Sequence, residues 1–184
     1  MRPLPRYERE RLVSEEQQQR VDETTVDAQT LKALAFVRTL VGHMQMSVEV
    51  NLAPNDGEGT PEEIRIEIEG PDAGRIIGKK GNVLDAIQYL TARVVVRPGE
   101  PRRHVIVDAE GYRARREANL RSMALRIANQ VRRSGQPVAL EAMPPNERRI
   151  IHMTLAETGD ISTESTGEGD QRRVVVSLKN PTHV

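Results

Sequence analysis

The spacing of hydrophobic positions in the first half of the chain changes twice, from a helical period to an alternating one and back. Between residues 27 and 44, apolar side chains recur every three or four positions behind Asp27, which predicts an amphipathic helix capped by that aspartate. Residues 46–52 and 64–69 then alternate apolar and polar side chains on either side of the turn-rich stretch PNDGEGTP. We expect two β-strands there, joined as a hairpin.

The helical spacing returns after Pro71. The stretch AGRIIG, residues 73–78, predicts a short helix, and a second helix is expected beyond KKG. Its predicted apolar face comprises Val83, Ile87, Leu90 and Val94. An apolar run at residues 104–107 predicts the next strand, and residues 110–111, Glu-Gly, interrupt the pattern. The predicted order is therefore helix, strand, strand, helix, helix, strand.

The second half begins with a long predicted helix that reaches about Ser134 and is ended by Gly135. Its inward positions are Leu120, Ala124, Ile127 and Val131. A short strand is expected at residues 138–140, and NERRIIHMTLAE predicts a helix that starts near Pro144 and Pro145. Residues 161–164 and 173–178 predict a closing hairpin around GEGD.

These patterns divide the chain into four segments and place it in the α+β class. Residues 1–26 are charged and glutamine-rich without an apolar period, so we expect a disordered tail or a loose helix. Residues 27–109 form the first predicted domain and residues 110–178 the second, a small α/β domain with helices packed on a three-stranded sheet. Residues 179–184 are expected to be a tail.

Composition removes several classes of protein. The chain has no cysteine, which excludes disulfide scaffolds, zinc fingers and cysteine nucleophiles. No stretch approaches the roughly 20 apolar residues that span a bilayer, so we expect a soluble protein without membrane insertion. Aromatic residues make up only 2% of the chain, which argues against a base-stacking platform of the RRM or OB-fold kind.

The zero net charge conceals a basic central block. Residues 71–135 hold 14 Lys and Arg against 6 Asp and Glu, whereas residues 1–70 hold 8 against 14. Such a block indicates a localised surface for a polyanion, although a solvated arginine-rich helix accounts equally well for the charge alone. On the predicted long helix we single out Arg115 and Arg116 as candidate phosphate contacts and treat the other arginines as solubilising.

The segment Gly78-Lys79-Lys80-Gly81 lies between two predicted helices. Glycines at both edges let a sugar-phosphate backbone approach closely, the lysines supply positive charge, and the following helix N-terminus favours anions. A P-loop is excluded because three residues rather than four separate Gly74 from Gly78, and Lys80 stands where Ser or Thr is required. An ordinary structural turn remains the alternative.

A second motif, Arg148-x-x-x-His152, lies on the predicted helix NERRIIHMTLAE. A spacing of four residues places both side chains on one face, one turn apart. There the arginine can fork onto a phosphate, and the histidine can hydrogen-bond to a base or stack on it. Alone, such a pair is common on surface helices.

The two motifs together carry a family resemblance. GRIIGKKGNVLDAIQYL resembles the core of a type II, prokaryotic KH domain, and EGYRARRE with PPNERRIIH is similar to the small Arg-xxx-His domain, which is named for an arginine and a histidine separated by three residues. In this order they resemble the Jag family, also called KhpB or EloR, over roughly residues 27–178. The resemblance implies that Arg75, Ile76, Ile77 and Asn82 flank the KH groove, where we expect both isoleucines to be core residues. Tyr89 and Tyr112 are likewise expected to pack rather than to stack on bases.

The resemblance also implies a function. We expect a cytoplasmic regulator that binds single-stranded RNA, or single-stranded DNA as the alternative, linked in bacteria to cell elongation and envelope synthesis. The expected partner is a small protein with a single KH domain, with a homodimer as the alternative. Many members carry a further N-terminal domain, which we expect to be lacking because only 26 residues precede the first predicted helix.

Two other classes of function compete with RNA binding. The first is a protein-interaction adapter that dimerises through its KH domain, with RNA incidental. The second is a nuclease acting through His152 with Glu147 or Glu157, but the sequence contains no metal-ligand spacing and no nucleophile with its base. We therefore expect a protein that is not an enzyme and needs neither a cofactor nor a metal ion.

Overall fold

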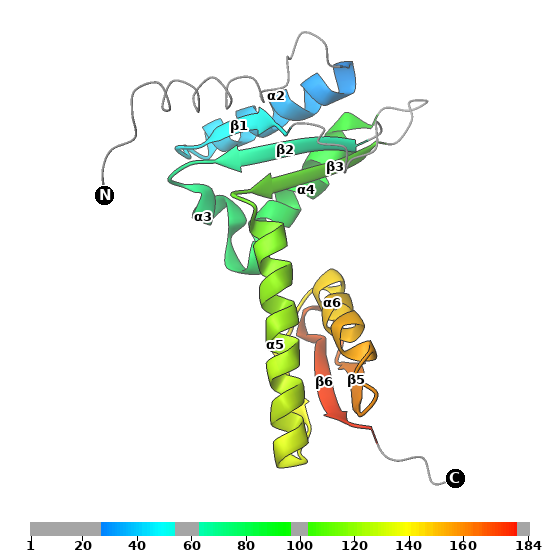
Figure 1. Ribbon diagram of the computed structural model, residues 1–184. Coiled ribbons are helices and arrows are strands. Elements are labelled where there is room, and N and C mark those ends of the chain that lie inside the picture. Colours follow the sequence, from blue (N-terminus) through cyan, green and yellow to red (C-terminus); the bar gives the residue numbers. More distant parts are fainter. Residues whose placement is uncertain (1–26, 54–62, 97–102, 180–184) are drawn as a thin grey trace, which may run out of the picture. The chain divides into compact units, whose positions relative to one another are not determined.

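The computed structural model describes residues 27–53, 63–96 and 103–179. The predicted tails at 1–26 and 180–184, which include His183, and the whole PNDGEGTP stretch lie outside these residues. The chain forms two compact units, one ending at Tyr112 and the other starting at Arg113 (Figure 1). Within the described residues, none of the helices has the length and apolar content needed to cross a lipid bilayer.

The first unit starts with helix α2, Ala28–His43. The Asp27 side chain accepts hydrogen bonds from the backbone N–H groups of Gln29 and Thr30, so the predicted cap is confirmed. Asp27 also pairs with Arg103. Partial burial alone would raise the pKa of this carboxyl, but the hydrogen bonds from Thr30 and Arg103 outweigh that effect and lower its pKa to about 2.

Three strands form the sheet of this unit, in the order β1-β2-β3. β1 (Glu49–Leu52) pairs antiparallel with β2 (Glu63–Glu69), as the predicted hairpin requires, and β3 (His104–Ala109) pairs parallel to β2. The three isoleucines of β2 are buried, while the residues that alternate with them lie on the opposite face. Helices α2 and α4 pack against each other and against the sheet (Figure 1).

The short helix α3 (Ala73–Ile77) and the longer α4 (Asn82–Val95) flank a 3-10 turn, η2 (Lys79–Gly81). The predicted apolar face of α4 is wrong in part. Ile87 is buried, but Leu90 is 46% exposed, and the remaining buried positions of α4 are Leu84, Thr91 and Val95. The buried stripe of this helix thus includes Thr91, whose hydroxyl is satisfied because it donates to the Ile87 carbonyl oxygen at 2.7 Å.

The two tyrosines differ in their surroundings. Tyr112 packs against the core, as expected. Tyr89 does not: it is 59% exposed, and the Arg93 guanidinium lies 5.1 Å from the centre of its ring. The prediction that Tyr89 is a packing residue is therefore wrong, because it lies on the solvent face of α4 beside Leu90.

The second unit combines two helices with a three-stranded antiparallel sheet in the order β4-β6-β5. Helix α5 spans Tyr112–Ser134, and all but its first residue belong to this unit. The remaining elements are β4 (Val138–Ala139), α6 (Pro145–Ala156), β5 (Ile161–Thr166), η3 (Gly169–Gln171) and β6 (Arg173–Leu178). Leu120, Ala124 and Val131 of α5 are buried as predicted, and Ala128 rather than Ile127 completes the buried set. Helices packed on small three-stranded sheets confirm the α+β class.

Candidate nucleic-acid interface

The backbone of the loop between α3 and α4 depends on its two glycines. Gly78 and Gly81 have φ values of +69° and +83°, and Lys80 between them has +55°. A Cβ atom on Gly78 would lie 2.5 Å from Cγ2 of Val83, and one on Gly81 would lie 2.9 Å from Cε1 of Tyr112. Both positions therefore exclude a side chain, by conformation and by space.

The side chains around this loop divide into an exposed and a buried set. Lys79 and Asn82 are exposed, as is Arg75, whose Nη1 lies 3.4 Å from Oδ1 of Asp72. Ile76 is fully buried and Ile77 packs against the same core, so the prediction that both are core residues is confirmed. The loop leads directly into α4, whose N-cap Gly81 has no side chain to occupy the first amides. The start of α4 is thus suited to an anion.

The second motif lies on α6 and faces the edge strand β5. Nε2 of His152 lies 2.8 Å from Oγ of Ser165, and its Nδ1 lies 2.7 Å from Oγ1 of Thr163. Nη1 of Arg148 donates to the same Ser165 oxygen at 3.3 Å, and its Nε donates to the Met143 carbonyl oxygen at 3.3 Å. Two hydroxyl groups of β5 therefore hold the predicted pair in place.

The partly buried imidazole of His152 has a lowered pKa. Burial is the main cause, and the positive charge of Arg148 adds to it. The neutral ring fits the contacts, because one ring nitrogen then donates to a hydroxyl of β5 and the other accepts from one, while Ser165 also accepts from Arg148. Neither hydroxyl follows from the sequence, because a Ser or Thr in a strand carries no signal for the helix that it faces.

The two arginines predicted on α5 have different environments. Arg115 is exposed. Arg116 instead forks onto Glu147 of α6, with Nε 2.7 Å from Oε1 and Nη2 2.9 Å from Oε2. Glu147 is only 4% exposed, and this bidentate pair ties α5 to α6. Glu147 is one of the two carboxylates of the nuclease alternative, and both of its oxygens are bonded to Arg116.

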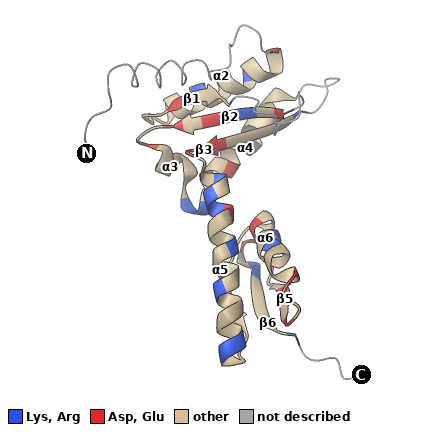
Figure 2. Ribbon diagram, viewed as in Figure 1, with Lys and Arg blue, Asp and Glu red and all other residues tan. Residues whose placement is uncertain are grey.

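Charge is unevenly distributed over the elements (Figure 2). Lysine and arginine occur at the loop after α3 and along α5, whereas the outer face of the first sheet is acidic. Burial raises the pKa of Glu67 on that face, and the neighbouring Asp108 and Glu69 add to the rise. Among the described residues, no group of three or more His, Asp or Glu side chains is arranged to hold a metal ion.

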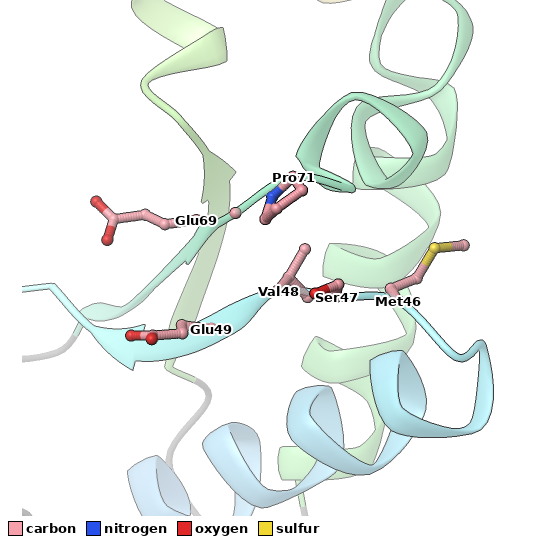
Figure 3. Close-up of a pocket in the computed structure, with 7 residues that line it drawn as sticks. Met46, Ser47, Val48, Glu49, Glu69 and Pro71 are labelled. Carbon is pink, nitrogen blue, oxygen red and sulfur yellow. The ribbon is translucent and has the colours of Figure 1, made fainter.

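A pocket lies at the end of the acidic face (Figure 3). Met46, Val48 and Pro71 contribute apolar atoms to it, and Glu49 and Glu69 stand opposite each other in the sheet register. Two adjacent carboxylates repel a phosphate group. This pocket is therefore unsuited to a polyanion, in contrast to the glycine-bounded loop in the first unit and to the Arg148 and His152 face and the exposed Arg115 in the second.

Comparison with known proteins identifies both units. A family model described as the KhpA/KhpB KH domain matches residues 31–107, and the model of the Arg-xxx-His domain family matches residues 118–178. The predicted types of the two domains, and their order, are therefore confirmed.

Curated relatives extend across both units. A protein of Clostridium symbiosum is 38% identical over 148 residues, which is 80% of this chain and 65% of the relative. One of Bacillus subtilis (strain 168) is 40% identical over 118 residues, or 63% of this chain and 57% of the relative. Both are named RNA-binding protein KhpB. This chain spans less than two thirds of the length of either, but it has the KH and Arg-xxx-His domains in the predicted order, and it belongs to the KhpB, or Jag, family.

Proposed function

We propose that this chain binds single-stranded RNA without catalysis and that the loop of Gly78, Lys79, Lys80 and Gly81 is its main contact. The observation that carries the proposal is the backbone of this loop, in which three of the four residues have positive φ values and the N-terminus of α4 follows at once. Such a loop lets a phosphate backbone approach without steric hindrance from side chains. Arg75 and Asn82 extend the contact on either side.

Arg148 and His152 supply a second contact. Arg148 brings a positive charge to the surface between α6 and β5, and the neutral imidazole of His152 offers hydrogen bonds to a base or a phosphate. Arg115 on α5 is a third candidate for phosphate binding. We assign Arg116 a mainly structural role, because its guanidinium is already bonded to a buried carboxylate.

The biological setting of this activity is also a proposal. The relatives' name supports RNA as the ligand rather than single-stranded DNA, and the resemblance supports a cytoplasmic, post-transcriptional regulator connected with cell elongation and envelope synthesis. A small protein with one KH domain is the proposed partner, supported by a family model that covers both KhpA and KhpB.

The test is a fluorescence titration of the chain with single-stranded RNA and with DNA of the same sequence at two salt concentrations. We expect the affinity for RNA to fall with salt and to fall at least tenfold in Lys79→Asp/Lys80→Asp. The matched control is Arg172→Asp/Lys179→Asp, which makes the same change in net charge at exposed positions outside the loop.

A second variant, Arg148→Gln/His152→Gln, tests the contact on α6 while keeping much of the bulk of both side chains. Circular dichroism of each variant verifies its fold. Equal RNA affinity of the lysine variant and its control would refute the proposal. If no RNA binding occurs even at low salt, the adapter hypothesis would replace it, and a pull-down in the presence of nuclease would identify its partner.

A further inference from the structure

A groove runs between α5 and α6 in the second unit, with a volume of about 800 Å³. Its apolar lining comes from Leu125 on α5 and from Ile150 and Met153 on α6. Leu125 is 48% exposed and Met153 is 62% exposed, so both project into solvent. Met153 follows His152 by one residue and is therefore turned about 100° around α6 from the face proposed to contact RNA.

The side chains beside Met153 form a charge pattern that is complementary to itself. One face of the helix carries, at intervals of four residues, a positive, an apolar and a negative side chain: Arg149, Met153 and Glu157. Within residues 103–179, no ion pair joins Arg149 or Glu157 to another side chain. Both charges are therefore available to a partner.

We propose that this groove is an interface between two copies of the chain, with the two α6 helices packed antiparallel around Met153. A two-fold axis through that residue places Arg149 of each copy opposite Glu157 of the other, so the same contact forms twice. Each Met153 side chain enters the groove of the other copy against Leu125 and Ile150. Met is suited to this role because its flexible thioether fills irregular gaps.

The size of the patch determines the strength of this contact. Nine residues line the groove, whereas a standard interface contributes about 20–30 residues on each side. The dimer is therefore weak, and it forms at high local concentration, as when several copies occupy one RNA. The proposal uses the Arg-xxx-His domain rather than the KH domain, and it does not depend on RNA binding.

Charge reversal gives a sharp test. In sedimentation equilibrium of the full chain, we expect Arg149→Glu and Glu157→Arg each to raise the dissociation constant of the dimer about tenfold, because two attractive contacts become repulsive. An equimolar mixture of the two variants restores dimerisation, because their stripes are complementary. The double variant, with both charges exchanged, also self-associates. Arg126→Glu is the matched control, an exposed reversal on α5 outside the groove.

A second measurement separates this interface from any other. The chain has no cysteine, so Met153→Cys introduces a single thiol close to the proposed axis. We expect this variant to form a disulfide-linked dimer on mild oxidation several times faster than Arg126→Cys. A chain that stays monomeric at millimolar concentration would overturn the proposal. So would a dimer that is unaffected by both reversals and cross-links equally at both cysteines.

Discussion

Ser165 contacts both residues of the Arg-xxx-His motif. Its single hydroxyl oxygen accepts from Arg148 and contacts Nε2 of His152, so one atom links the two side chains that give the domain its name. Together with Thr163, it fixes both ring nitrogens of the histidine. A phosphate or base that displaces Ser165 from Arg148 would also change the hydrogen bonding of the imidazole.

The lowered pKa of His152 predicts a pH dependence of stability. Since its folded-state pKa lies below the usual 6.5, the unfolded chain binds the proton more tightly, and the folded state loses stability as pH falls below 6.5. We expect the stability of the wild type relative to His152→Gln to be greater at pH 7.5 than at pH 5.5. Urea unfolding of both proteins at each pH measures this difference. A difference that is independent of pH would contradict the prediction.

For individual residues, the sequence predicted the two motifs but not the side chains that contact them. Glycine pairs and an arginine and histidine one turn apart are visible in the chain because their spacing is local. The contacts of His152 with β5, and of Arg116 with Glu147, join residues on different elements, which only the fold brings together. Charge alone therefore marked Arg116 as a phosphate contact, although it is bonded to a buried carboxylate.

The pair of Arg116 and Glu147 connects two elements, α5 and α6. Replacing Arg116 by Met leaves the Glu147 carboxylate buried without its partner, and we expect this to lower the free energy of unfolding by about 3 kcal/mol. The double variant Arg116→Met/Glu147→Leu is expected to recover most of that loss, because no isolated charge remains. Urea denaturation provides the measurement.

Arg121→Met is the matched control for this prediction. The Nη2 atom of Arg121 lies 2.6 Å from Oε1 of Glu117, but both side chains are well exposed. Breaking such a surface pair costs less than about 1 kcal/mol. Similar losses for Arg116→Met and Arg121→Met would show that burial of Glu147 does not govern the strength of the first pair.

Helix α4 illustrates what periodicity can and cannot predict about an element. Its existence and extent follow from the apolar spacing after Gly81. Two overlapping stripes of side chains could form the buried face, however, and the apolar pattern alone predicted the stripe that contains Leu90. The structure buries the stripe that contains Thr91, since a threonine bonded to its own helix can be buried without an unsatisfied hydroxyl. Leu90 and Tyr89 are consequently exposed to solvent.

For the whole molecule, the two proposed contacts on one chain predict a dependence on RNA length. An RNA long enough to reach both sites converts the second contact into an intramolecular one, which raises affinity by roughly a hundredfold over an RNA that reaches only one. We expect this gain to disappear in Lys79→Asp/Lys80→Asp and in Arg148→Gln/His152→Gln. Titration of each protein with a short and a long oligonucleotide measures the gain. A gain that persists in either variant would contradict the proposal of two contacts.

The parallel pairing of β2 with β3 affects how the chain acquires its structure during synthesis. β5 and β6 are neighbours in sequence, so their ladder can form as soon as both have been made. The second edge of β2, in contrast, can pair only with β3. Ile64 pairs with Val105, so this ladder forms only after α3 and α4, which lie between the two strands in sequence, have been translated. Until then the nascent first unit carries an unpaired strand edge rich in isoleucine, which is the kind of segment that aggregates or recruits chaperones. A ribosome that slows shortly before residue 104 would prolong that exposure.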